Sequence, residues 1–363
     1  MVIPEFGLTG QQRLKGAKVL VIGAGGLGAP LLLYLAAAGV GTLGIVDFDC
    51  IEESNLQRQV LFTTADLGQP KAEVTAARLR ALNPHCQVQV YAQRLGVENA
   101  LALVQDYHII ADATDNFLTR YLINDACVLA GKPLVYGSIY RFEGQVSVFN
   151  VLQADGRRSP HYRDVFPVPG AAPNCAESGV LGTLPGIIGT WQANEVIKLI
   201  TGLGEPLTGK LLLFDALTNE TRLIKYRHRP DTAPVRALSL NPDLTCNITE
   251  PNNLSEKIMK EVTVQELKAL IDNNADFQLI DVREPHEYQI ANLGGELIPL
   301  GQVDAQADKI ARDKQVVVHC RSGARSGNAI QFLEQKYGLQ NLFNLKGGIL
   351  AWSDEIDPSV PKY

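Results

Sequence analysis

The chain has 363 residues, enough for two domains that each bury a core, and its formal charge of -6 argues against nucleic acid as a partner. No apolar run is long enough to span a membrane, and residues 1–6 lack the pattern of a signal peptide, so we expect a cytoplasmic protein. Six scattered cysteines without C-x-x-C pairing fit a reducing compartment.

The first pattern with chemical meaning is the β-branched run 19–22, which leads into the glycines Gly23, Gly25, Gly26 and Gly28. The spacing fits G-x-G-x-x-G, in which missing side chains allow a tight turn, close approach of a phosphate, and close packing of helix on strand. The following helix would direct its N-terminus at an anion. By itself the pattern is compatible with NAD, FAD or ATP, and with a turn that binds nothing.

The next elements complete a βαβ unit: a helix over 31–38 that Gly39 can end, and a strand over 42–46. The strand finishes at Asp47. Because an acidic residue about 20 positions beyond the glycines usually holds a ribose hydroxyl, Asp47 is the candidate for that role. The alternative is a capping carboxylate at a strand end.

Two cationic residues follow, Arg58 and Lys71, and Lys71 stands near the start of a helix predicted to run to Leu82. A hydride-transfer enzyme has no need of cations here. Beside a bound triphosphate they would neutralise the charge that develops when a nucleotidyl group is transferred. Solvated surface charge is the alternative.

A buried strand over 108–115 comes next and ends in the carboxylate of Asp115, followed by a helix through Ala130 and a strand over 133–136. Ligands bind at the carboxyl ends of parallel strands, so Asp115 is well placed to hold Mg²⁺ beside phosphates. It could instead cap the following helix.

Residues 157–180 lack periodicity and are expected to form a long loop, which in a compact domain is usually functional or disordered. Cys175 lies in this loop. A helix over 184–201 and strands over 210–214 and 222–226 then complete the first domain.

Over residues 4–228 the chain resembles the ubiquitin-activating-type adenylyltransferases, specifically the molybdopterin-synthase and thiamine-biosynthesis sulfur-carrier adenylyltransferases. The resemblance rests on G-A-G-G-L-G, D-F-D, N-L-Q-R-Q, G-Q-P-K, D-A-T-D-N and E-G-Q-V-S-V-F, which occur in this order. It implies a Rossmann-like α/β domain that uses ATP and Mg²⁺. The implied ATP site comprises Gly23, Gly25, Gly26, Gly28, Asp47, Asp49, Asn55, Arg58, Gln59, Lys71 and Asp115.

Within that site, the resemblance assigns Gly26 and Asp47 to the adenosine part of ATP, Arg58 and Lys71 to the phosphates, and Asp115 to the magnesium. It also implies a homodimer through this domain, and a loop that crosses over the tail of a carrier protein and holds a cysteine at position 175. The Cys175 thiol could attack an acyl-adenylate or exchange with a persulfide. An inert loop cysteine is the alternative.

The chain departs from the family in two places. Members commonly hold zinc with two C-x-x-C pairs, but here the corresponding residues are 161–164 (His-Tyr-Arg-Asp) and 232–236, so we expect no zinc. Members also have an N-terminal helix with Arg-Tyr-x-Arg, whose arginine reaches the ATP of the neighbouring subunit. This sequence starts after that helix, so we expect either an upstream start or a site without that cation.

Residues 229–260 turn polar and rich in Asn and Pro, which predicts a linker between a domain over 1–228 and a smaller one over 261–363. In the second domain, a strand over 315–319 runs into Cys320, followed by a loop and a helix. Loop amides and a helix N-terminus favour a thiolate nucleophile there. The spacing from Cys320 to Arg325 is C-x-x-x-x-R, one residue shorter than in phosphatases of this type, and suits a sulfur atom better than a phosphate.

Residues 261–357 resemble a single rhodanese domain, on D-V-R-E-P-H-E-Y, the cysteine loop and L-K-G-G-I-L-A-W. The resemblance implies Cys320 as persulfide carrier, with Arg321 or Arg325 stabilising the sulfur or the donor anion. A rhodanese fold used only for docking is the alternative. The implied persulfide loop comprises Cys320, Arg321, Ser322, Gly323, Ala324 and Arg325.

Together the two domains predict an enzyme that adenylates the C-terminal glycine of a ubiquitin-like, Gly-Gly-ended sulfur carrier protein and then converts it to a thiocarboxylate. Thiosulfate or a cysteine desulfurase persulfide would supply the sulfur. Such thiocarboxylates feed molybdopterin (molybdenum cofactor), thiamine, cysteine or tRNA thiolation pathways. The competing hypotheses are an NAD-dependent oxidoreductase with a sulfur-handling appendage and a scaffold that binds the carrier without activating it.

Overall fold

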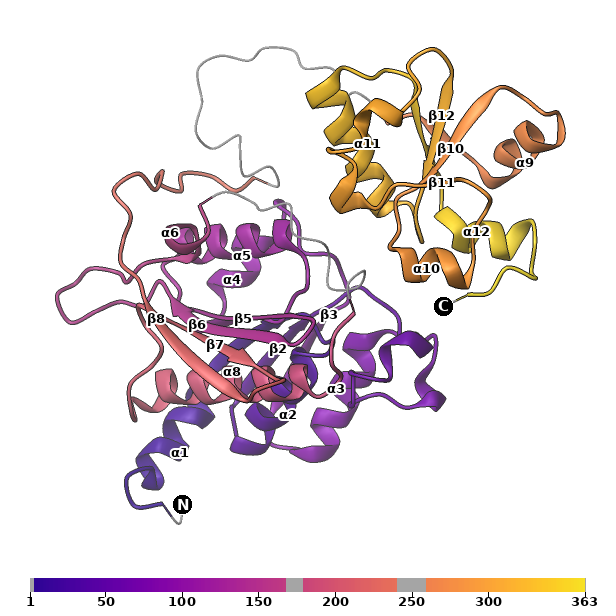
Figure 1. The fold of residues 1–363 in the computed structure, drawn as a ribbon. Helices are drawn as coiled ribbons and strands as arrows, with labels where there is room; N and C mark the ends of the chain where they lie inside the picture. Colours follow the sequence, from indigo (N-terminus) through magenta and orange to yellow (C-terminus); the bar gives the residue numbers. More distant parts are fainter. Residues whose placement is uncertain (1–2, 168–178, 240–258, 363) are drawn as a thin grey trace. The chain divides into compact units, whose positions relative to one another are not determined.

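The chain divides into two compact units, Met1–Glu250 and Pro251–Tyr363, in a computed structural model that describes residues 3–167, 179–239 and 259–362 (Figure 1). The division falls inside the segment expected to be a linker. Each unit contains its own β-sheet and its own hydrophobic cores.

The first unit is built on an eight-stranded sheet in the order β3-β2-β1-β4-β5-β6-β7-β8. The pairings from β3 to β5 are parallel, and those from β5 to β8 are antiparallel. The parallel half has the near-continuous apolar sequence expected of strands covered on both faces. The strands are β1 Lys18–Ile22, β2 Thr42–Val46, β3 Gln87–Tyr91, β4 Ile109–Asp112, β5 Leu134–Tyr140, β6 Glu143–Phe149, β7 Lys210–Asp215 and β8 Glu220–Lys225.

Helices cover both faces of this sheet (Figure 1). One core is formed with α1 Gly7–Gly16, α2 Gly28–Ala38, α3 Lys71–Leu82 and α8 Leu184–Thr201. The other core is formed with α4 Ala100–Gln105, α5 Phe117–Ala130 and α6 Tyr162–Val165. Two short 3₁₀ helices, η1 Glu53–Asn55 and η2 Thr64–Asp66, lie between β2 and α3.

Several predicted elements have the expected bounds because local signals fix them. Gly39 and Gly202 take left-handed conformations just after α2 and α8, which ends those helices as predicted. The structure corrects three predictions. The strand expected over 108–115 is β4, which ends at Asp112, so Asp115 lies in the connection to α5. The loop expected over 157–180 contains the short helix α6, and the strand expected to end at Tyr136 continues to Tyr140, where it pairs with β6.

The second unit is a five-stranded, all-parallel sheet in the order β11-β10-β12-β13-β9. Its strands are β9 Glu261–Val262, β10 Phe277–Asp281, β11 Glu296–Leu297, β12 Gln315–His319 and β13 Leu342–Leu345. Its helices are α9 Val264–Asp272, α10 Pro285–Ile290, η4 Leu300–Gln302, η5 Ala307–Lys309, α11 Ala324–Tyr337 and α12 Gly348–Glu355.

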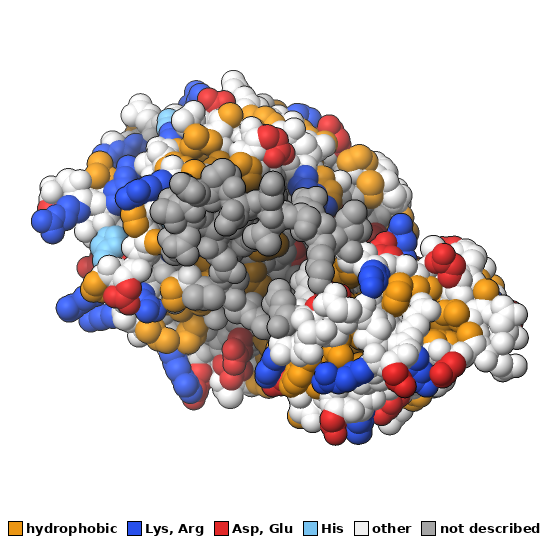
Figure 2. Space-filling view, turned by 90° about the horizontal axis from the view of Figure 1, so that it is seen from above, with side chains coloured by type: hydrophobic (Ala, Val, Ile, Leu, Met, Phe, Trp, Pro, Cys, Tyr) orange, Lys and Arg blue, Asp and Glu red, His pale blue; other side chains and the backbone are white. Residues whose placement is uncertain are grey.

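The surface carries charges of both signs, as the modest net charge predicts. On the face drawn in Figure 2, basic and acidic side chains are interspersed with hydrophobic ones. Among the described helices, none combines the length and apolar character needed to cross a membrane.

Candidate active sites

The crevice beside β1 is where the fold of the first unit favours a ligand. β1 lies between β2 and β4, and Ile22 at its end is level with both Val46 and Asp112. The chain order of the strands reverses here, and ligands of open α/β sheets bind outside the carboxyl ends of strands at such a point. The residues after β1, β2 and β4 therefore meet at one site.

In the glycine loop after β1, the first and last glycines leave no room for a β-carbon. Gly23 has a φ of +98°, and a β-carbon there would lie 2.7 Å from the carbonyl oxygen of Ala113, just after β4. A β-carbon on Gly28 would lie only 2.0 Å from the carbonyl oxygen of Gly23. The first glycine thus makes the turn beside β4, and the last allows α2 to start against it.

Asp47, at the end of β2, holds this loop in place. Its carboxylate accepts hydrogen bonds from the amides of Ala24 (2.7 Å) and Asp49 (2.9 Å). Burial raises the pKa of Asp47 above its ordinary value, and the two amide hydrogen bonds oppose that shift. The Asp47 carboxylate therefore joins β2 to the glycine loop, in addition to being the candidate ribose ligand.

Lys71, the first residue of α3, is brought back to the same strand end. Its ammonium nitrogen lies 3.2 Å from a carboxylate oxygen of Asp49, and its amide donates to the Asp49 carbonyl. Lys71 is only 6% exposed, which contradicts the alternative of solvated surface charge. A buried lysine with one partly exposed partner is a cation available to an anionic ligand.

The segment that contains Asn55, Arg58 and Gln59 packs on the glycine loop. The side-chain nitrogen of Gln59 lies 3.3 Å from where a β-carbon on Gly25 would stand, and the Gln59 side-chain oxygen has no hydrogen-bond partner among the described residues. Asn55 is buried, and the Arg58 guanidinium donates to the carbonyl of Ser54 (3.0 Å).

Asp115 lies exposed in the connection from β4 to α5. Asn116 caps α5, since its side chain accepts from the amide of Thr119, so the cap alternative for Asp115 is wrong. Asp112, which the sequence did not single out, is buried and accepts from both the amide and the hydroxyl of Thr114. Burial raises the pKa of Asp112, and this carboxylate orients the strand end that leads to Asp115.

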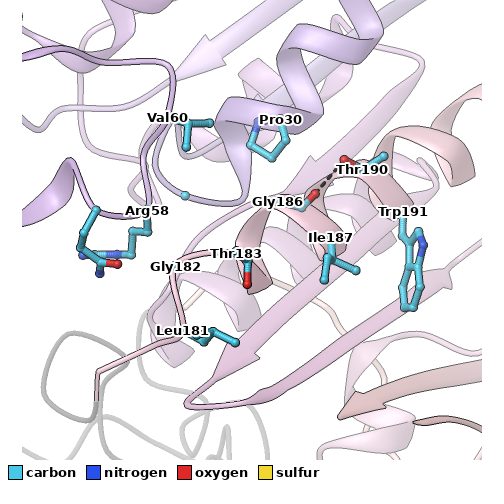
Figure 3. Close-up of a pocket in the computed structure, with 12 residues that line it drawn as sticks. Pro30, Arg58, Val60, Leu181, Gly182, Thr183, Gly186, Ile187, Thr190 and Trp191 are labelled. Carbon is cyan, nitrogen blue, oxygen red and sulfur yellow. Dashed lines mark hydrogen bonds between the residues drawn. The ribbon is translucent and has the colours of Figure 1, made fainter. Parts of the chain in front are cut away.

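A cavity of about 750 Å³ opens beside the glycine loop, on the side of α2 and α8 (Figure 3). Of the predicted site residues, Gly26 and Arg58 line it. Ile187 and Trp191 project from α8 toward it, and the other lining residues are Pro30, Gln57, Val60, Leu181, Gly182, Thr183, Gly186 and Thr190.

Around residues 161–164, where the family resemblance would place zinc ligands, hydrogen bonds join α6 to the segment after β8. Asp164 accepts from the amides of His161 (2.9 Å) and Arg229 (3.0 Å), and its carboxylate lies 3.1 Å from His228 Nδ1. Within the described ranges, no group of three or more His, Cys, Asp or Glu side chains is arranged to hold a metal ion. Cys175 lies outside the described residues.

In the second unit, Cys320 lies fully buried between the end of β12 and the start of α11. Its sulfur accepts the amide hydrogen of Gly323 (3.1 Å) and lies 3.4 Å from the hydroxyl of Ser326. A thiolate at this position would be stabilised by backbone N–H groups and by the N-terminal end of α11. The predicted loop residues are thus brought together, and Ser326 adds a contact that the sequence reasoning missed.

The two loop arginines differ in their surroundings. Arg325 is 5% exposed and donates two hydrogen bonds (2.6 and 2.8 Å) to the carboxylate of Glu287 on α10. Arg321 is partly exposed. Arg325 therefore fixes the loop to α10, and Arg321 is the better placed of the two to meet a donor anion.

A group of buried polar side chains lies at the ends of β10 and β12, next to the cysteine loop. Arg283 is fully buried, and its Nε donates to both carboxylate oxygens of Asp281 at the end of β10. His319, just before Cys320, lies 3.7 Å from Asp281, and burial lowers its pKa to about 4. His319 is thus a neutral residue at neutral pH.

Comparison with known proteins gives matches over both units. A model described as the ThiF family matches residues 1–235, and one described as a rhodanese-like domain matches 263–355. The chain is 45% identical over 369 residues to the "Probable adenylyltransferase/sulfurtransferase MoeZ" of Mycobacterium tuberculosis, covering 100% of this chain and 93% of that protein. It is 39% identical over 389 residues to "Adenylyltransferase and sulfurtransferase MOCS3-2" of Zea mays, covering 100% and 80%.

Two further matches concern the first unit. The "Sulfur carrier protein adenylyltransferase" of Thermus thermophilus is 53% identical over 233 residues, covering 63% of this chain and 86% of that protein. The crystal structure of E. coli MccB with MccA-N7isoASN matches with a TM-score of 0.56 at 23% identity, covering 62% of this chain and 68% of that one. At that identity the structural match supports the fold alone.

Proposed function

The chain belongs to the ThiF family and carries a rhodanese-like domain, and we propose that its two units act in turn on one substrate, the C-terminal glycine of a ubiquitin-like sulfur carrier protein. It is an adenylyltransferase and sulfurtransferase, as full-length relatives are named. The observation that carries the proposal is the pairing of a phosphate-type glycine loop with a buried lysine in one unit and a buried cysteine loop in the other. The proposed boundaries are 1–228 and 261–363, with 229–260 as linker.

In the first half-reaction, a carboxylate oxygen of the carrier's terminal glycine attacks the α-phosphorus of ATP. The bond to pyrophosphate breaks, and an acyl-AMP forms. The glycine loop and Asp47 would hold the adenosine part, while Lys71 and Arg58 would neutralise the charge that develops on the phosphates. The buried position of Lys71 beside Asp49 supports this assignment.

Asp115 is the residue we propose for Mg²⁺. It is an exposed carboxylate that follows the strand end touching Gly23, and magnesium prefers a carboxylate, water and phosphate oxygens. A bound magnesium ion would shield the negative charge of the triphosphate. We propose no resident zinc, because residues 161–164 and 232–236 contain no cysteine and the carboxylate of Asp164 is engaged by the amides of His161 and Arg229.

In the second half-reaction, Cys320 carries the sulfur as a persulfide. The terminal sulfur attacks the acyl carbonyl, AMP leaves, and an acyl disulfide joins the carrier to Cys320. Cys175 would then attack the Cys320 sulfur, releasing the thiocarboxylate and leaving a disulfide for a dithiol reductant to reopen. Arg321 would contact the anionic donor, either thiosulfate or a cysteine desulfurase persulfide, since its side chain is partly exposed whereas that of Arg325 is buried.

We propose a homodimer through the first unit, in the cytoplasm. The cavity walled by Ile187 and Trp191 of α8, with the 70%-exposed Val60 at its edge, is an apolar surface of the kind that subunits cover. Sedimentation would show a dimer that Ile187→Asp converts to a monomer. If the native protein is a monomer, the proposed homodimer is wrong, but the proposed reaction is unaffected.

Which pathway receives the thiocarboxylate depends on the carrier.

The function is tested by intact-mass measurement of Gly-Gly-ended carriers incubated with the protein, ATP, Mg²⁺ and thiosulfate. An AMP adduct reports the first half-reaction, and replacement of one oxygen by sulfur reports the second. Cys320→Ala should keep the adduct and lose the thiocarboxylate, whereas the exposed Cys50→Ala should keep both.

Two results would contradict the proposal. If the protein binds a carrier but gives neither an adduct nor ATP–pyrophosphate exchange, it is a scaffold. If NAD quenches the protein's fluorescence and ATP does not bind, the first unit is an oxidoreductase.

A further inference from the structure

Ser326, on the first turn of α11, lies at a junction of three acceptors. Its hydroxyl oxygen is 2.7 Å from the side-chain oxygen of Asn344, 3.1 Å from the carbonyl oxygen of Gly323, and 3.4 Å from the sulfur of Cys320. Ser326 and Cys320 are fully buried, and Asn344, on β13, is 6% exposed. Water is therefore largely excluded from this group of side chains.

A hydroxyl has one hydrogen, so it can satisfy one of these acceptors at a time. When Cys320 is a neutral thiol, the short contact to Asn344 takes that hydrogen. When Cys320 is a thiolate, its charge makes the sulfur the stronger acceptor. The Asn344 amide can then turn its NH₂ group to the Ser326 oxygen, which keeps both side chains paired.

We propose that Ser326, oriented by Asn344, donates a hydrogen bond to the thiolate of Cys320 and so stabilises the charged form on which sulfur transfer depends. The inference rests on the proposed role of Cys320 as persulfide carrier and adds a second residue to it. Because Ser326 contacts the reacting sulfur, it is a catalytic residue, whereas Asn344 acts through it as a positioning residue.

The hydrogen bond from Ser326 acts in persulfide formation, which begins with the Cys320 thiolate. Its sulfur attacks the outer sulfur of thiosulfate, a new S–S bond forms, and the S–S bond of the donor breaks. Sulfite leaves as a dianion with the bonding electron pair, the Cys320 sulfur becomes neutral, and the terminal sulfur of the persulfide keeps the negative charge it carried in thiosulfate. When an acceptor such as cyanide later takes that terminal sulfur, the Cys320 sulfur leaves as a thiolate, and the Ser326 hydroxyl can again donate to it.

The same unit offers a matched control outside the persulfide loop. Ser353, on α12, is buried as Ser326 is, and its hydroxyl donates to the carbonyl of Val360 (2.7 Å). Ser353→Ala removes a buried, hydrogen-bonded hydroxyl of the same kind and leaves the contact between Ser326 and the sulfur in place. Ser326→Thr keeps a hydroxyl at the buried position.

The test uses the full chain and follows persulfide formation from thiosulfate in a single turnover, by the mass gain of one sulfur. Because a hydrogen bond to a charged group is stronger than one between neutral groups, we expect Ser326→Ala to slow the reaction about 10- to 150-fold. Ser326→Thr should recover most of the rate, and Ser353→Ala should match the native protein.

Asn344→Ala should slow the reaction in the native background and have no added effect in Ser326→Ala, since coupled residues are not additive. The proposal is overturned if Ser326→Ala matches Ser353→Ala, or if Ser326→Thr is as slow as Ser326→Ala, since a hydroxyl at this position would then have no effect on the reaction. These outcomes are distinct from failure of the proposed function, in which Cys320→Ala itself would still form the persulfide.

Discussion

A single added methyl group at Gly28 tests the glycine loop. A β-carbon there would lie 2.0 Å from the Gly23 carbonyl oxygen, so α2 must move away from β1 to accept it. We expect Gly28→Ala to lower the free energy of unfolding by about 1–3 kcal/mol and to abolish ATP–pyrophosphate exchange. Urea titration and the exchange assay measure the two effects.

Gly16→Ala is the control for that substitution, because a β-carbon at Gly16 meets no atom within 4 Å. It should leave stability and exchange close to native values. If Gly28→Ala behaves like Gly16→Ala, the loop is not built on the close approach that its glycines indicate.

Single residues were predictable where the backbone itself demands a residue type. The glycine pattern reports a turn and a close approach, and the structure shows both at Gly23 and Gly28. The roles of side chains that depend on a partner far away in the sequence could not be predicted in this way. The sequence offered Arg321 and Arg325 as equals, but Arg325 is buried against Glu287, 38 residues earlier, whereas Arg321 is partly exposed.

At the scale of elements, predictions succeeded where strong local signals coincide. β2 and β12 have the expected bounds because each is a short apolar run between polar residues, α3 because Pro70 precedes it, and α8 because Gly202 ends it. β3 was not predicted, because its alternating glutamines leave it partly exposed at the edge of the sheet. Nor was α6, whose four residues are too few for periodicity and are fixed by tertiary contacts instead.

The α6 contacts predict a pH-dependent contribution to stability. Burial alone would raise the pKa of Asp164, but hydrogen bonds from the Arg229 and His161 amides outweigh it and hold the pKa below its usual value. A carboxylate whose pKa is lower in the folded chain stabilises the fold above its unfolded pKa of about 4 and loses that effect as pH falls through the folded value.

Asp164→Asn should therefore cost about 1–3 kcal/mol of unfolding free energy at neutral pH, and the difference from the native protein should narrow below about pH 4. Urea titrations at both pH values measure this. Asp155→Asn, at an exposed position, is the control and should change little at either. A difference that stays constant with pH would show that the Asp164 charge does not stabilise the fold.

At the scale of the whole molecule, the two-unit organisation was predictable from composition, because a polar stretch without apolar periodicity cannot add to a core. The parallel order of strands around β1 follows from its βαβ pattern. The antiparallel half of the sheet could not be predicted in this way. The residues of β6 were recognised only as a sequence motif, and the position of β6 between β5 and β7 depends on long-range pairing.

Each unit has one tryptophan that contacts its own hydrophobic core, Trp191 on α8, which is partly buried, and Trp352 on α12, which is buried. Replacing one by phenylalanine in the full chain makes fluorescence report the unfolding of the other unit. Because ATP would bind only the first unit, a concentration of 100 times Kd should add about 2.7 kcal/mol to the transition that Trp191 reports and nothing to that of Trp352. Equal shifts in both variants would mean that the two cores unfold as one, and that ATP bound to the adenylating unit also stabilises the unit that carries the sulfur.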